Sequence, residues 1–91
     1  MQHLSLSTFA MEALRSRRLH TRIIAAGQSQ PTLVEEANNL MLRADAIASE
    51  AYDAVHNGGA GCDCRNLYPQ IDEMEGITSM LARIISRQTE A

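Results

Sequence analysis

The chain contains neither lysine nor tryptophan, and only three of its 91 residues are aromatic. These are Phe9, Tyr52 and Tyr68. Because aromatic side chains supply much of the apolar area that a core buries, this core must be built from leucine, isoleucine, methionine and alanine. A chain of this length forms one domain at most and buries a limited share of its surface. We therefore expect a partner or a second copy to add to the core.

The sequence also lacks long apolar runs and the cysteine pattern of a disulfide framework. No stretch approaches the roughly 20 apolar residues that a membrane-spanning helix needs, and the N-terminal residues lack the order of a secretory signal. The two cysteines, Cys62 and Cys64, do not form the pattern of a disulfide framework. A cytoplasmic, reducing setting is the expected one.

Charge is unevenly distributed, although the formal net charge is only -3. Residues 1–30 carry four arginines and one glutamate, whereas residues 31–91 carry four arginines and ten acidic residues. Halves of opposite charge can steer an encounter or stabilise a self-complementary assembly.

Hydrophobic periodicity predicts three helices, over about residues 7–26, 32–56 and 66–87. Gly27 is expected to end the first helix as a C-cap, because glycine adopts the left-handed conformation at little cost. Thr32 and Glu35 fit a capping box at the start of the second helix. Between the second and third helices, the glycine-rich segment Asn57–Gly61 indicates a loop.

The second and third helices each carry an apolar seam with alternating steps of four and three residues. The positions expected in the core or in a dimer contact are Leu33, Leu40, Ala44, Ile47, Ala51, Ile71, Met74, Leu81 and Ile85. Two such helices joined by a short loop form an antiparallel hairpin, and either the first helix or a second copy could cover its open side. The sequence thus predicts one all-α domain over residues 1–91, an antiparallel hairpin plus an N-terminal helix, which homodimerisation completes.

Cys62, Asp63 and Cys64, with His56 six residues before the first cysteine, are the best candidates for metal ligands. A zinc site needs about four ligands, and the Cys-x-Cys spacing is not the usual one for zinc. We interpret the segment as a loop with two thiols and no bound zinc. An intersubunit disulfide or a redox-sensing role stays open.

Catalytic patterns are missing from the sequence. The carboxylates Asp72, Glu73 and Glu75 belong near the start of the third helix, where they favour the helix dipole. No serine lies in a nucleophile elbow, and no glycine motif follows a strand as a phosphate loop would. We expect no enzyme activity, no catalytic residue and no cofactor.

The first helix combines apolar side chains with the one basic run of the chain. Three arginines share a helical face, but aromatic residues for base stacking are missing, which argues against direct nucleic-acid binding. An apolar helix face seated in the groove of another protein is the better match. The residues expected to bind a partner are Phe9, Leu14, Arg15, Arg18, Leu19, Arg22, Ile23 and Ile24.

Two groups of residues in the last two helices carry a resemblance to a known family. They are the run Leu42–Ile47, then Glu73, Met74, Ser79, Leu81 and Ile84–Ser86. In these residues the chain resembles the TraM-type anti-activators of bacterial quorum sensing. The resemblance covers about 55 residues and depends mainly on helical periodicity. This chain has a shorter loop before its glycines than that family and lacks its terminal Leu-Gly. The QslA type of anti-activator also fits the size and the arginine-rich composition.

The resemblance implies a cytoplasmic helical protein that binds a LuxR-type transcription factor and prevents its dimerisation or its DNA binding. Two alternatives stay open. One is a phage- or plasmid-borne inhibitor, for example of a CRISPR effector, which would use the acidic residues Glu50, Asp53, Asp72, Glu73 and Glu75. The other is a purely structural helical dimer.

Overall fold

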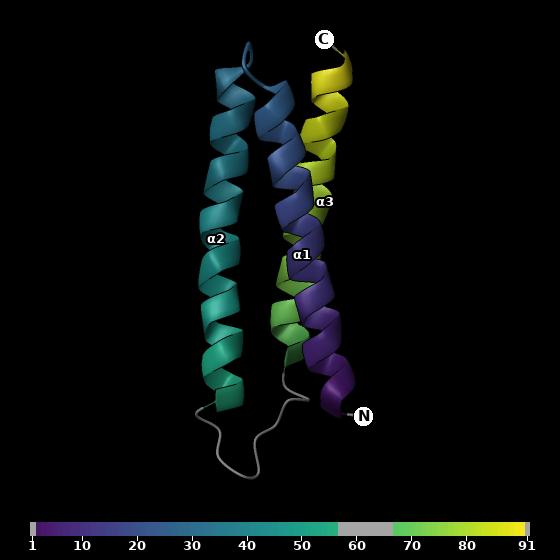
Figure 1. Cartoon of the computed structure of the whole chain (residues 1–91), viewed down its shortest axis with the longest axis vertical. Helices are drawn as coiled ribbons and strands as arrows, with labels where there is room; N and C mark the ends of the chain where they lie inside the picture. The colour runs from purple at the N-terminus through teal and green to yellow at the C-terminus, as the bar shows by residue number, and fades with distance from the viewer. Residues whose placement is uncertain (1, 57–66, 91) are drawn as a thin grey trace.

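The chain forms a bundle of three helices that lie side by side along its long axis (Figure 1). This computed structural model describes residues 2–56 and 67–90. Helix α1 covers Gln2–Ala26, α2 covers Pro31–His56 and α3 covers Tyr68–Glu90. Helix α2 runs antiparallel to the other two, and the bundle extends over 50 × 19 × 17 Å. The predicted all-α fold is confirmed.

The start of α2 differs from the predicted capping box. Helix α2 begins at Pro31, and the Val34 amide donates a hydrogen bond to the Gln30 carbonyl, with 3.2 Å between nitrogen and oxygen. Proline suits this first helical position because its missing N–H would have no partner inside the helix. Thr32 therefore lies within the first turn, and its assignment as the cap was wrong.

Gly27 ends α1 for a different reason from the predicted one. Its backbone is not in the left-handed region, so the expected cap conformation is absent. An added Cβ would instead lie 2.5 Å from Cγ2 of Val34 and 2.7 Å from the Ile23 carbonyl oxygen. Glycine is needed here because α2 turns back tightly against the end of α1.

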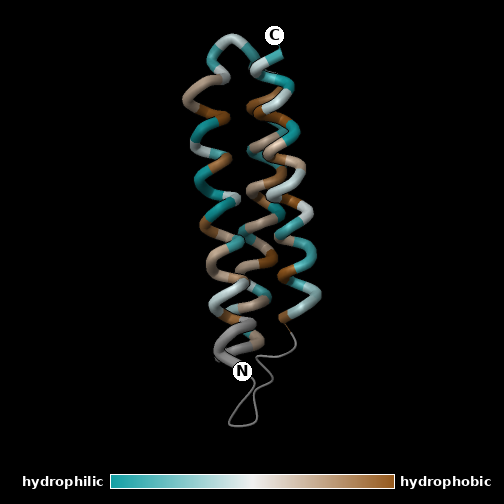
Figure 2. Tube along the Cα trace, turned by 90° about the vertical axis from the view of Figure 1, so that its right-hand side faces the viewer, coloured by the Kyte–Doolittle hydropathy of each residue, from teal (hydrophilic) through white to brown (hydrophobic). Residues whose placement is uncertain are grey.

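All three helices contribute to one apolar core. Its buried side chains are Phe9, Ile23, Leu33, Ala37, Ala44, Ile47, Ala51, Leu67, Ile71, Met74, Ile77, Leu81 and Ile84. Leu40 and Ile85, also predicted in the seam, are partly buried against this cluster. Apolar positions recur along each helix between hydrophilic ones (Figure 2). The predicted seam thus packs within a single chain, and homodimerisation stays a prediction.

Helix α1 packs on both α2 and α3. Its core side repeats every seven residues at Phe9, Ser16 and Ile23, and all three are buried. The Ser16 hydroxyl donates to the Ala13 carbonyl oxygen at 2.7 Å and lies 3.7 Å from the sulfur of Met74 in α3. Because serine is small and its hydroxyl is satisfied, α1 can approach α3 closely at little cost.

The described helices also lack a membrane span, since none of them is both long and apolar enough to cross a bilayer.

Candidate protein-interaction surfaces

One side of α1 points away from the bundle and combines apolar and basic side chains. We call Met11, Leu14, Arg15, Arg18 and Arg22 the α1 outer face; all five are exposed. Steps of three, four and seven residues place them on one side of the helix, opposite the buried side. Met11 is 69% exposed and Leu14 is 47% exposed. An apolar strip bordered by cations therefore lies open to solvent.

The charges of the α1 outer face are largely uncompensated. Arg15 lies 3.8 Å from Glu12 on the same helix, and the arginine side chain is well exposed. At this separation, and with the guanidinium open to water, the pair contributes little to stability. Within the described residues, Arg18 and Arg22 take part in no ion pair. A partner that offers carboxylates would therefore not have to break existing pairs.

The residues predicted to bind a partner do not all lie on this face. Phe9 and Ile23 are buried in the core, so the structure does not present them to a partner. Leu19 is half-buried in a groove between α1 and α3 that also holds Glu75 and Ala82. Ile24 is exposed at the end of α1.

Met11 was missed by the sequence analysis, although a signal for it existed. It precedes Leu14 by three residues and Arg18 by seven, so it belongs to the same helical side. Apolar residues occur on more than one side of α1, so hydropathy does not distinguish its inner side from its outer side. The burial of Phe9, Ser16 and Ile23 in the structure does.

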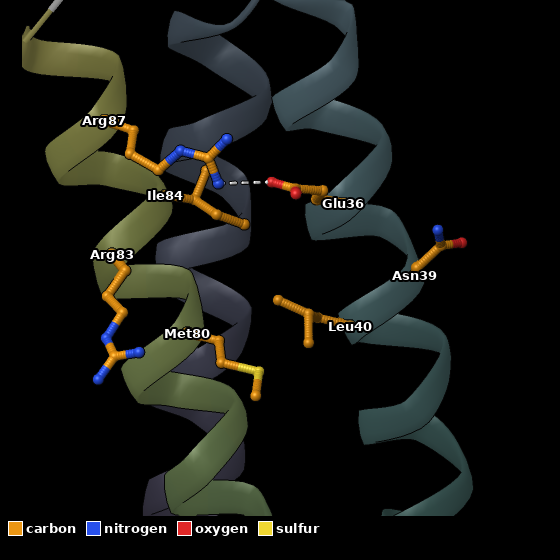
Figure 3. Close-up of a pocket in the computed structure, with 7 residues that line it drawn as sticks. All are labelled: Glu36, Asn39, Leu40, Met80, Arg83, Ile84 and Arg87. Atoms are coloured by element: carbon orange, nitrogen blue, oxygen red, sulfur yellow. Dashed lines mark hydrogen bonds and ion pairs between the residues drawn. The ribbon is translucent and has the colours of Figure 1, made fainter.

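A second surface is an open groove of about 400 Å³ between α2 and α3 (Figure 3). Its apolar part consists of Leu40 from α2 with Met80 and Ile84 from α3. An ion pair between Glu36 and Arg87 spans the two helices at 2.9 Å. The remaining lining residues are Asn39 and Arg83.

The end of α2 and the start of α3 lie at the same end of the bundle (Figure 1), and both carry acidic residues. Glu50 and Asp53 are exposed on α2, and Asp72 is exposed on α3. Glu73 forms a close ion pair with Arg43 of α2, so its charge is already matched. Glu75 lies apart from them, in the groove between α1 and α3.

In the part of the chain that the structure describes, no cluster of histidine, cysteine and carboxylate side chains could hold a metal ion. The segment proposed from sequence, Cys62 to Cys64 with the side chain of His56, lies outside the described residues. The interpretation of that segment as a loop with free thiols stays a prediction.

No family model matches the chain, and neither a curated protein nor a solved structure matches it. The resemblance to quorum-sensing anti-activators therefore depends on the residues of α2 and α3 quoted above.

Proposed function

We propose that this chain is a protein-binding regulator that docks the α1 outer face on a partner. The observation that supports this most directly is the exposure of Met11 and Leu14 beside Arg18 and Arg22. Methionine and arginine are enriched at protein interfaces relative to the rest of the surface. The core does not use these side chains, since all four lie outside the buried cluster.

The chemistry of the face defines its partner. An exposed helix with apolar residues at steps of three, four and seven fits an apolar groove of another protein. Arginines along the edge of the strip favour carboxylates on both sides of that groove, because complementary charge speeds the encounter and fixes its register. The expected partner surface is thus an apolar groove bordered by acidic residues.

A LuxR-type transcription factor is the first partner to test, because the resemblance of α2 and α3 points to that class. Binding would act by occlusion. The helix face would replace contacts that the regulator makes with its own second copy or would block its hold on DNA. This proposal assigns no catalytic residue and no cofactor.

The experiment combines the purified chain with LuxR-type regulators from the same genome. Loss of the regulator–DNA complex in a gel shift, together with a co-eluting protein pair in size exclusion, is the expected result. Intact DNA complexes and no co-elution, with every regulator of this class, would remove the LuxR partner from the proposal.

Two matched leucines test the face itself. Leu14→Asp places a charge in the α1 outer face, whereas Leu42→Asp places the same charge on an exposed position of α2. Both residues are open to solvent, so both variants should keep the helical circular dichroism of the parent. We expect Leu14→Asp to weaken partner binding by about tenfold or more, or about 1.4 kcal/mol, and Leu42→Asp to leave it unchanged. Equal losses in both variants would argue against this face.

A second candidate function uses the acidic end of the bundle. In the described structure, Glu50, Asp53 and Asp72 are exposed and form no ion pair. Carboxylates in such an arrangement could occupy the nucleic-acid site of an effector, as the inhibitor alternative requires. If Glu50→Arg with Asp53→Arg abolishes inhibition and Leu14→Asp does not, this second function replaces the first.

A further inference from the structure

Helix α3 carries a row of exposed residues that lie outside the buried core. We call Asp72, Gly76, Met80 and Arg83 the α3 face. Steps of four, four and three residues place them on one side of the helix. All four are exposed, and Met80 is 52% exposed at the edge of the groove between α2 and α3 (Figure 3).

Packing among the described residues does not require a glycine at position 76. A Cβ added to Gly76 would meet no described atom within 4 Å. Glycine inside a helix is less favourable than alanine because it loses more backbone freedom on folding. Glycine does, however, let another backbone or side chain come close. A contact outside the chain would explain this residue, whereas the bundle itself does not.

The charges of the α3 face are self-complementary. Asp72 lies at its N-terminal end and Arg83 at its C-terminal end, and neither forms an ion pair within the described residues. The midpoint between these two residues nearly coincides with the midpoint between Gly76 and Met80. A two-fold axis through the exposed side of α3 at that height, between Gly76 and Met80, would bring each residue of the row opposite its complement on a second copy.

We propose that two copies of this chain pair antiparallel through their α3 faces. Each Met80 covers the Gly76 of the other copy, and two Asp72–Arg83 ion pairs flank this centre. The occupant of the face is a second copy because the same surface supplies both the acid and the base. Helix α1 packs on the side of α3 that bears Thr78 and Ala82, which is not part of the α3 face.

The pairing is expected to be weak. Helix α3 has 23 residues and is therefore about 35 Å long. A contact along one helix buries less area than the roughly 800 Å² per partner of a standard interface. The dimer should form with rising concentration and dissociate on dilution.

Sedimentation velocity of the full chain over a concentration series, in reducing buffer, tests the proposal. The parent should shift from monomer to dimer as concentration rises. Asp72→Arg and Arg83→Asp should each raise the dissociation constant by about tenfold or more, because symmetry opposes like charges at both ends of the contact. The double variant with both substitutions restores the opposite charges and should dimerise like the parent.

Two further variants separate this contact from general charge and folding effects. Arg18→Asp changes the net charge as Arg83→Asp does, but on α1, and should leave dimerisation intact. Gly76→Leu adds a side chain into open space of the single chain, so it should stay helical but monomeric. A monomeric parent at every concentration would overturn the proposal. So would unaltered dimerisation of the folded Asp72→Arg and Arg83→Asp variants, or a folded double variant that stays monomeric.

Discussion

At the scale of single residues, the most informative position is Ser16, which with Thr78 is one of two polar residues buried among the apolar side chains. Its hydroxyl donates to the Ala13 carbonyl oxygen of its own helix and lies beside the Met74 sulfur. A buried polar group that keeps its hydrogen bond costs little. A large apolar residue at this position would have to push α1 away from α3. The small side chain therefore sets how closely these two helices pack.

Glycine substitutions at two positions should have opposite effects on stability. Gly27→Ala introduces a Cβ against Val34 and against the Ile23 backbone, so we expect the free energy of unfolding to fall by about 1–3 kcal/mol. Gly76→Ala, the matched control, adds a methyl group in open space and should raise it by about 0.5–1 kcal/mol. Urea denaturation of dilute protein measures both values. A stable Gly27→Ala variant would show that the turn between α1 and α2 is looser than described.

At the scale of helices, α2 and α3 were predictable because their apolar residues follow strict steps of four and three. Such a pattern defines one buried side, and each predicted seam residue is buried or partly buried. Helix α1 was not predictable in the same way. Ser16 occupies its buried row, while Met11 and Leu14 lie on its exposed side. Hydropathy alone therefore assigned Phe9 and Ile23 to a partner surface when they belong to the core.

Adjacent isoleucines on α1 test its orientation. Ile23 is fully buried, whereas Ile24 is 39% exposed. Ile23→Asp would bury an unpaired charge and should cost more than about 4 kcal/mol, most of the stability of a small domain. Ile24→Asp, the matched control, should cost about 1 kcal/mol or less, because its carboxylate can reach water. Circular dichroism with thermal unfolding measures both. Similar melting temperatures for the two variants would contradict the described orientation of α1.

At the scale of the whole molecule, the candidate interaction surfaces could be located only after α1 was placed on the bundle. The basic run in α1 was visible in the sequence, and so was the acidic excess of residues 31–91. Which arginines lack partners was not visible, because ion pairs such as Arg17–Asp45 and Arg43–Glu73 join segments far apart in the chain. Which side of α3 stays exposed beside α1 likewise depends on how the helices pack, and the local sequence pattern does not show it.

The role of α1 in folding gives a prediction for the entire bundle. Phe9 and Ile23 lie in the same buried cluster as Ile47, Met74 and Leu81. Removal of residues 1–26 would expose one side of the α2–α3 seam to water, and a two-helix remainder of this size rarely supplies enough core to fold alone. We expect the chain that begins at Gly27 to lose cooperative unfolding and most of its helical circular dichroism.

The alternative is that two copies of the α2–α3 hairpin pair, with the second copy in the place of α1. The same shortened chain distinguishes this pairing from loss of structure. A four-helix dimer of α2 and α3 would keep its helical signal, unfold cooperatively and sediment as a stable dimer even when diluted. That result would mean that the seam can pair between copies and that α1 is dispensable for the core. Loss of structure would instead assign α1 two functions, since its inner side would complete the core while its outer side stays free for a partner.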